Sequence, residues 1–382
     1  KWIDKIDLDG TTLRALLINS CKHPLNAKMP DVFWGHGAVD LSTIIPIDGD
    51  FGVQITPQWR KPELTSNIKE DMKKPSVDEN GHVAAKIDVK SNKVDLQITL
   101  SYLDVELGAE SPIPLNHDLD LIVVSPEGTI YKGDHLAHND TQHTSTNEKI
   151  IIAKEEIQAG TYTLHVYGNS FADSYSINKQ EFAVVASGDI DNQYLLFTNS
   201  TESPCKDEDP NHKGMCRCNE NEIGPICQSV ITTVKGTQYE VELDPLQVMR
   251  VKFIADKKIF GVRSSSNNPG RWSTIWASKE CHLNLGDYEI NGQTGKQTGK
   301  LTSIDFGSNE ICVAIFNIND KTTNYSIELE FNNPTKNKTI IIVVVVIVCV
   351  IIIIAIALLV YFFACKKKYA KMASESTNMQ LI

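Results

Sequence analysis

Residues 94–102 read VDLQITLSY, and this stretch decides the fold class. Apolar residues at every second position alternate with Asp, Gln, Thr and Ser, so an extended strand has one apolar and one polar face. The same period of two recurs at residues 119–123, 162–166, 182–186 and 325–331. Several short alternating strands joined by turns indicate β-sandwiches. The sequence therefore predicts a mainly β protein.

Two polar stretches interrupt this pattern. Residues 59–80 are charged and contain proline, and residues 267–300 are rich in Asn, Gly, Ser and Thr. Both compositions are typical of surface loops. The strands around them are expected to form two β-rich domains, at residues 48–188 and 229–333, and the second should be sandwich-like.

An uncharged, apolar run extends from Ile340 to Ala364. As a helix it would reach roughly 37 Å, enough to cross a hydrocarbon core of about 30 Å. Lysines follow directly, and positive charge favours the cytoplasmic side for the tail at residues 365–382. The sequence predicts one transmembrane helix over residues 340–364 and a single-pass, type I protein of the plasma membrane. A buried core helix is the alternative, but it would not require so long an uncharged run.

The start and the charge of the chain carry two further expectations. The chain begins at Lys1 without the apolar segment of a signal peptide, which an extracellular N-terminal portion normally needs. We therefore expect it to be the C-terminal part of a longer protein. The net charge of −11 argues against nucleic acid as a partner, because phosphate binding needs clustered Lys and Arg. The lipid bilayer is the predicted partner of residues 340–364.

A short Cys-rich element lies between the two β-rich regions, at residues 200–228. Cys216 and Cys218, followed by Gly224 and Cys227, fit C-x-C-x5-G-x2-C, the pattern that closes an EGF-like module. A peptide this short cannot bury a core, so disulfides must hold it. We expect the pairs Cys205–Cys216 and Cys218–Cys227; four cysteines allow three connectivities. A rigid spacer and a receptor-binding module are both open interpretations.

Other residues also suggest an extracellular location. Cys281 and Cys312 lie in the second β-rich region, and we pair them. The six cysteines from Cys205 to Cys312 can all be paired, and this even set fits an oxidising compartment; Cys21 stands alone near the start of the chain. Asn139, Asn199 and Asn324 each begin an Asn-x-Ser/Thr sequon and are candidate glycosylation sites.

The first 47 residues predict a helix followed by a glycine turn. Residues 13–21 read LRALLINSC and residues 33–41 read FWGHGAVDL. The helix is mainly apolar and should bury against something absent from the chain. The pair resembles the closing segment of a subtilisin-like serine peptidase domain (peptidase family S8). By this resemblance, residues 1–47 are the tail of an α/β catalytic domain, with its closing turn at Trp34, Gly35, Gly37 and Asp40.

The following region extends this resemblance. Leu119-Asp-Leu and Ser125-Pro-Glu-Gly-Thr129 are similar to a stretch of the C-terminal jelly-roll domain in a subset of subtilisin-like peptidases. His117 stands where that family often has Asn. The resemblance implies a jelly-roll β-sandwich at residues 48–188. It also makes Asp118 and Asp120 candidate calcium ligands, since calcium binds carboxylate oxygens; no cofactor is required.

The activity implied by the resemblance is peptide-bond hydrolysis through an Asp–His–Ser triad. None of those catalytic residues can be carried over to this chain. Gly10-Thr-Thr12 lacks the serine of the family's G-T-S segment, and His36 lies inside the glycine turn. The chain alone should therefore be inactive, with protein or peptide substrates bound by the missing catalytic domain. The alternative is a non-enzymatic, membrane-anchored adhesion or receptor protein.

Overall fold

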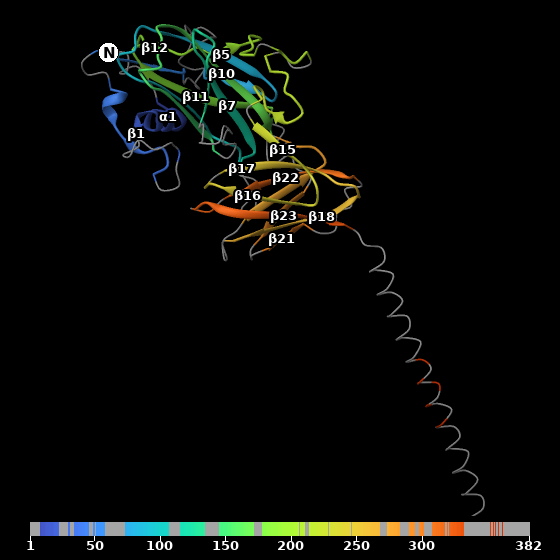
Figure 1. The fold of residues 1–382 in the computed structure, drawn as a ribbon. Coiled ribbons are helices and arrows are strands. Elements are labelled where there is room, and N and C mark those ends of the chain that lie inside the picture. The colour runs from blue at the N-terminus through green and yellow to red at the C-terminus, as the bar shows by residue number, and fades with distance from the viewer. Residues whose placement is uncertain are drawn as a thin grey trace, which may run out of the picture. The chain divides into compact units, whose positions relative to one another are not determined.

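The strands of the computed structural model follow the alternation of apolar and polar residues. The structure describes residues 8–22, 30, 34–45, 49, 51–57, 73–106, 115–133, 145–171, 178–205, 207–210, 214–227, 229–245, 247–267, 273–282, 290–294, 298–301, 308–317, 319, 321–331, 352, 354, 356, 358 and 361. The chain divides into two units, Lys1–Glu330 and Phe331–Ile382. The first unit is mainly β (Figure 1).

Two sheets make up the first sandwich, the name used here for residues 52–199. Its strands are β3 (Gly52–Ile55), β4 (Ser76–Asp78), β5 (His82–Val89), β6 (Leu96–Tyr102), β7 (His117–Val124), β8 (Ile130–Lys132), β9 (Asn147–Ile152), β10 (Gly160–Phe171), β11 (Lys179–Gly188), β12 (Gln193–Tyr194) and β13 (Thr198–Asn199). One sheet has the order β13-β5-β10-β7-β8, and the other has the order β12-β3-β11-β6-β9, with β4 also paired to β11. Neighbouring strands are antiparallel, except that β12 runs parallel to β3.

The core of the first sandwich is built from the apolar positions of the predicted strands. Leu100 of β6 and Val184 of β11 are fully buried in one sheet, and Leu164 and Val166 of β10 are fully buried in the other. All four belong to a single apolar cluster. The period of two in the sequence therefore marks the facing surfaces of the two sheets.

The second sandwich, residues 229–331, also consists of two sheets. Its strands, with one short strand contributed by the Cys-rich element, are β14 (Glu222–Ile223), β15 (Ser229–Lys235), β16 (Gln238–Leu243), β17 (Val248–Ile254), β18 (Ile259–Ser266), β19 (Ser273–Ser278), β20 (Ile290–Thr294), β21 (Thr298–Leu301), β22 (Glu310–Phe316) and β23 (Thr323–Phe331). The sheet orders are β14-β15-β17-β22-β19-β20 and β16-β23-β18-β21. Trp276 packs with Val248 and Cys312 in its core.

Both predicted loops contain strands. Residues 76–78 form β4, which pairs with β11, while residues 58–72 lie outside the described part of the chain. Within 267–300, β19 pairs with β22 on one side and β20 on the other. Ile275, Trp276 and Ala277 are buried, so tertiary pairing and burial outweigh the polar composition of this stretch.

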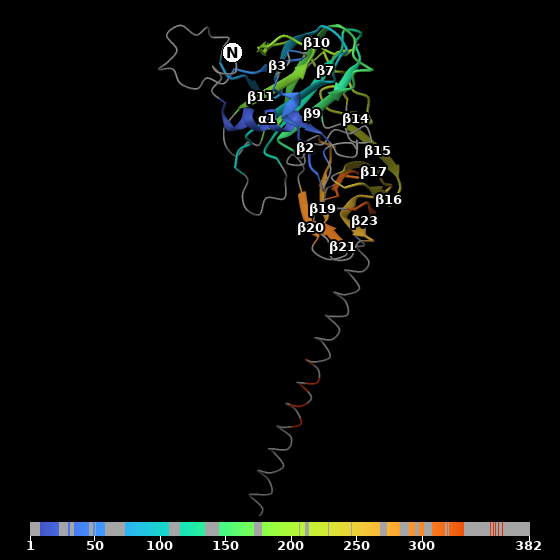
Figure 2. The same cartoon turned by 90° about the vertical axis from the view of Figure 1, so that its left-hand side faces the viewer.

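Residues 8–45 form a small cap on the first sandwich. They contain α1 (Gly10–Ser20), β1 (Cys21–Lys22), β2 (Ala38–Val39) and the 3-10 helix η2 (Leu41–Thr43). Figures 1 and 2 both draw α1 beside β11, and α1 also contacts β6. The expectation that this helix buries against something absent from the chain is therefore wrong for its inner face, which packs on the sheet.

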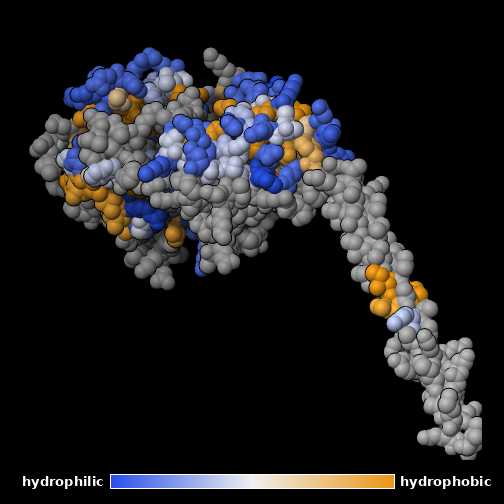
Figure 3. Space-filling model, turned by 60° about the horizontal axis from the view of Figure 1, so that its bottom comes forward, coloured by the Kyte–Doolittle hydropathy of each residue, from blue (hydrophilic) through white to orange (hydrophobic). Residues whose placement is uncertain are grey.

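The second unit is described at few positions. Residues 352, 354, 356, 358 and 361 are helical and exposed, and the described part of this segment is the orange and pale patch among grey atoms in Figure 3. Among the residues that the structure describes, no helix is long and apolar enough to cross a membrane. Most of the predicted span at residues 340–364, and the whole predicted tail at residues 365–382, lie outside the described residues.

Candidate functional site

The predicted closing turn is a tight reversal built on two glycines. Gly35 and Gly37 have φ values of 55° and 101°, in the left-handed region that favours glycine. The Gly37 backbone N–H donates to the carbonyl oxygen of Trp34 at 2.9 Å. The Asp40 carboxylate accepts hydrogen bonds from the backbone N–H and the hydroxyl of Ser42, at 3.1 and 2.6 Å, and so caps η2. The four predicted residues therefore form one turn.

The beginning of α1 is fixed by a charged cap. Asp9 accepts a hydrogen bond from the backbone N–H of Thr12 at 2.9 Å, the usual role of an N-cap carboxylate. The buried Lys74 ammonium lies 2.5 Å from the same carboxylate group. One turn further on, Ala15 packs with Val185 of β11 in a small apolar cluster. The helix is thus attached at its first turn and along its inner face.

A buried asparagine sets how α1 lies on the sheet. The Asn19 side chain is fully buried. Its amide nitrogen donates to the Ser187 hydroxyl at 2.8 Å, and its amide oxygen accepts from the Thr99 hydroxyl at 3.0 Å. Ser187 belongs to β11 and Thr99 to the neighbouring β6. Because both ends of the amide are satisfied by different strands, rotating or sliding the helix would leave buried polar atoms unpaired.

Lys149 closes the C-terminal end of the helix. This residue of β9 is only 7% exposed, and its ammonium donates to the carbonyl oxygens of Ile18, Asn19 and Cys21 at 2.9, 3.0 and 2.7 Å. The last carbonyls of a helix have no partner within the helix, and a cation there also interacts favourably with the helix dipole. Lys149 therefore satisfies the end of α1 together with two backbone donors, the Cys21 N–H to the Ile18 carbonyl and the Asp40 N–H to the Ser20 carbonyl.

The opposite side of this cap is apolar and exposed. We name the outer apolar face after five side chains that are 39% to 53% exposed: Leu13, Leu17, Trp34, Val39 and Leu41. Leu13 and Leu17 belong to α1, Val39 to β2 and Leu41 to η2, and α1 contacts both β2 and η2; Trp34 lies in the glycine turn before β2. Single exposed apolar residues are ordinary on a protein surface, whereas a group of them on adjoining elements is typical of a surface that packs against another part of a protein.

His36 lies between the two glycines of the turn. Burial, and to a lesser extent the positive charge of Lys149, lower its pKa to about 4. The imidazole is therefore neutral at pH 7 and adds no positive charge beside the Lys149 ammonium.

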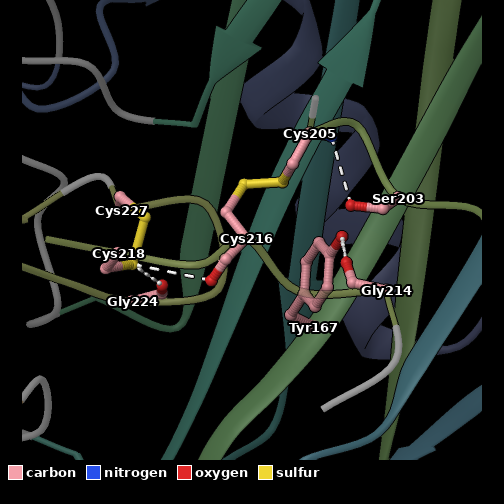
Figure 4. Close-up of a disulfide and its surroundings, with 8 residues drawn as sticks. All are labelled: Tyr167, Ser203, Cys205, Gly214, Cys216, Cys218, Gly224 and Cys227. Carbon is pink, nitrogen blue, oxygen red and sulfur yellow. Dashed lines mark hydrogen bonds between the residues drawn. A yellow bond between two sulfur atoms is a disulfide. The ribbon is translucent and has the colours of Figure 1, made fainter. Parts of the chain in front are cut away.

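The Cys-rich element is held by the two predicted disulfides. Cys205 is bonded to Cys216 and Cys218 to Cys227, with Cα atoms 5.3 and 5.2 Å apart (Figure 4). Gly224 has a φ of 107°, so this position favours glycine in the turn that precedes the last cysteine. The cysteine spacing therefore predicts the correct one of the three possible connectivities.

The third predicted disulfide lies in the second sandwich. Cys281 and Cys312 are bonded, with Cα atoms 5.1 Å apart, and they close 31 residues of sequence. Cys312 is fully buried on β22 beside Trp276. Of the cysteines that the structure describes, Cys21 is the free one, and it is buried at the end of α1.

Two of the three candidate glycosylation sites lie in the described part of the chain. Asn199 of β13 and Asn324 of β23 are both exposed, as attachment of a glycan requires. Asn139 lies outside the described residues.

The candidate calcium ligands are strand residues rather than loop residues. Asp118 and Asp120 belong to β7, and each is only 2% exposed. The Asp118 carboxylate accepts a hydrogen bond from the Asn169 amide at 3.3 Å. Across the described ranges, no group of three or more His, Cys, Asp or Glu side chains is arranged to hold a metal ion. Calcium binding at these two residues stays a prediction.

Comparison with known proteins adds little. No protein-family model matches the chain, and no curated protein does. Among solved structures, the CUB1-EGF-CUB2 domains of rat MASP-1 align with 11% identity over 73% of this chain and 97% of that one, with a TM-score of 0.16. The PBSX exported protein XepA aligns with 8% identity over 81% of this chain and 99% of that one, also with a TM-score of 0.16. Because both TM-scores are this low, neither structure supports a conclusion about the fold or the function of this chain.

The sequence predicted the glycine turn but not the side chains that attach α1 to the first sandwich. Lys149 follows Glu148 in a strand with no motif of its own, and nothing in its neighbours indicates a helix cap. Asn19 did carry a signal, because it is a polar residue within the apolar stretch LRALLINSC. Such a residue is expected to be exposed or to meet a polar partner in the core.

Proposed function

We propose that this chain is the C-terminal portion of a membrane-anchored, subtilisin-like serine endopeptidase at the cell surface. The observation that supports this proposal is the two-sided cap at residues 8–45. Its inner side is fastened to the first sandwich by Asn19 and Lys149, and its other side carries the outer apolar face. A segment that ends one domain and braces the next needs both surfaces.

In this proposal the first sandwich is the jelly-roll domain that braces the catalytic domain. The preceding catalytic domain would pack on the outer apolar face and would hydrolyse peptide bonds with its own Asp–His–Ser triad and oxyanion hole. The present chain contributes no group to that chemistry. Its contribution is to hold the last helix and turn of the catalytic domain in place.

The remaining parts have the roles of spacer, stalk and anchor in the same proposal. The Cys-rich element is an EGF-like spacer, and the second sandwich is a stalk between it and the membrane. Residues 340–364 span the plasma membrane with the ectodomain outside the cell, and residues 365–382 form the cytoplasmic tail. The substrates are proteins or peptides bound in the catalytic domain.

Deletion of residues 48–188 from the parent enzyme is expected to abolish peptide turnover, because the closing helix loses the sheet that binds its inner face. Turnover of a quenched fluorescent peptide by the protein at the cell surface is the measurement. Deletion of residues 229–333, which make no part of this brace, is the control and should leave most of the turnover. Full activity without residues 48–188 would contradict the proposed role.

A further inference from the structure

Two buried histidines of the first sandwich face each other across neighbouring strands. His82 of β5 and His165 of β10 are 8% and 2% exposed, and Nε2 of His82 lies 2.8 Å from Nδ1 of His165. At this distance a single hydrogen between the two nitrogens makes a hydrogen bond. A hydrogen on each nitrogen would place two N–H groups against each other. The observed contact therefore excludes the state in which both imidazoles are protonated to cations.

The same histidine pair lies directly under the Cys-rich element. The Tyr167 ring stacks on His82 with centroids 4.2 Å apart and planes inclined by 7°, and its hydroxyl donates to the Gly214 carbonyl at 2.7 Å (Figure 4). A Cβ atom on Gly214 would lie 2.6 Å from Nδ1 of His82, so Gly214 is in direct contact with the imidazole. That Nδ1 atom is buried and has no hydrogen-bond partner among the described residues.

Apolar packing completes the contact between the two parts. Ile122 and Tyr167 of the first sandwich form one cluster with Ile226 of the Cys-rich element. Met215 and the disulfide formed by Cys205 and Cys216 pack against this cluster. Any change that moves the His82 or Tyr167 ring must therefore disturb the packing of the Cys-rich element on the first sandwich.

We propose that His82 and His165 form an acid-released latch that holds the Cys-rich element, residues 200–228, on the first sandwich. With both imidazoles neutral, one hydrogen bond joins them and the ring of His82 supports Tyr167 and Gly214. Protonation of both puts two positive charges and two opposed N–H groups into a buried contact. The rings must then separate, and the element that rests on them is released.

Burial sets the direction of this dependence, and the surrounding charges modify it. Burial lowers the pKa of both His82 and His165 to about 4; the neighbouring His165 further lowers the pKa of His82, and Lys86 further lowers that of His165. Glu202 acts in the opposite direction on His82. Burial, with Asp120 and Glu208, raises the pKa of Tyr167, so its hydroxyl keeps its proton throughout. Opening of the contact therefore lets the two histidines bind protons in mild acid.

Docking of the Cys-rich element weakens as the pH falls, because docking is linked to proton binding by the two histidines. The released histidines have an ordinary pKa near 6.5, whereas the docked ones have a pKa of about 4. The released state therefore binds more protons between these values. Docking is at full strength above pH 6.5, weakens as the pH falls, and reaches its minimum near pH 4.

Hydrogen exchange of the full 382-residue chain in mild detergent tests the latch. After correction for the intrinsic exchange rate, protection of amides in residues 214–227 should fall at least about tenfold between pH 7 and pH 4.5. Residues 311–316 in the second sandwich should keep their protection. The double variant His82→Gln/His165→Asn keeps an amide at each facing position but cannot titrate, so its protection should not depend on pH. His36→Asn, at a half-buried histidine outside the latch, should behave as the wild type does.

A second variant keeps the test decisive if the double variant does not fold. Tyr167→Phe removes the hydrogen bond to Gly214 but no titrating group of the latch, so it should lower protection of residues 214–227 by a similar factor at both pH values. Unchanged wild-type protection at pH 4.5 would overturn the proposal. So would a loss of protection in His82→Gln/His165→Asn as large as that in the wild type.

Discussion

Replacing Lys149 with methionine is expected to lower the free energy of unfolding of the first sandwich and its α1 cap by about 3 kcal/mol. The ammonium donates to three carbonyl oxygens at the end of α1, and it is 7% exposed, so water cannot readily take its place. Methionine fills a similar volume but removes all three hydrogen bonds, and within the described part of the chain only the Ile18 carbonyl keeps a second donor, the Cys21 backbone N–H. Urea unfolding of the full chain, monitored by hydrogen exchange of residues 13–20 and 98–102, measures this loss of unfolding free energy.

A second lysine provides the matched control. The side chain of Lys154 is 55% exposed and lies 3.9 Å from Glu155, a surface contact of little energetic value. Lys154→Met should change the free energy of unfolding by no more than about 0.5 kcal/mol. If Lys149→Met lowers the free energy of unfolding no more than Lys154→Met does, Lys149 does not hold the C-terminal end of α1. The proposal that the first sandwich braces this helix then loses its main support.

Removing the disulfide of the second sandwich is expected to have an effect of similar size. The bond closes 31 residues of sequence, and the chain-entropy relation gives about 3–4 kcal/mol for a loop of this length. Cys312 is also fully buried against Trp276, so truncation to alanine removes packed volume as well. Urea unfolding of Cys281→Ala/Cys312→Ala, monitored by hydrogen exchange of residues 311–316, measures this loss of unfolding free energy.

The shorter disulfide of the Cys-rich element is the comparison. Cys218 and Cys227 are nine residues apart, and the same relation gives about 2–3 kcal/mol. Cys218→Ala/Cys227→Ala should loosen residues 214–227 and leave residues 311–316 protected. Loss of protection in the second sandwich from this variant, or none from Cys281→Ala/Cys312→Ala, would show that the disulfides do not act locally as assigned.

The β-sandwich character could be predicted because its signal is local. In β6, β10 and β11, apolar residues at every second position are the ones that the core buries, and a strand on a half-buried sheet needs that period. The strand β19 gives no such signal, because Ser and Thr surround Ile275 and Trp276. Its place between β20 and β22 depends on partners distant in sequence, which a local period cannot reveal.

The candidate site could be predicted only in part, for the same reason. The glycine turn was readable, since positive φ values select Gly35 and Gly37 directly. The docking of α1 was not, because it depends on the buried polar contacts of Asn19 and Lys149 across the chain. His82 and His165 are 83 residues apart, and only the pairing of β5 with β10 brings them together.

Labelling with a fluorophosphonate tests the proposed peptidase most directly. Intact cells that carry the native full-length protein are treated with the probe, and the protein is isolated with an antibody against residues 189–335. Covalent labelling of this polypeptide at a serine preceding Lys1, blocked by prior treatment with an unlabelled serine-peptidase inhibitor, is the predicted result. Absence of labelling on protein that is folded at the cell surface and is not an unprocessed precursor would contradict it, and would favour a non-enzymatic adhesion or receptor protein.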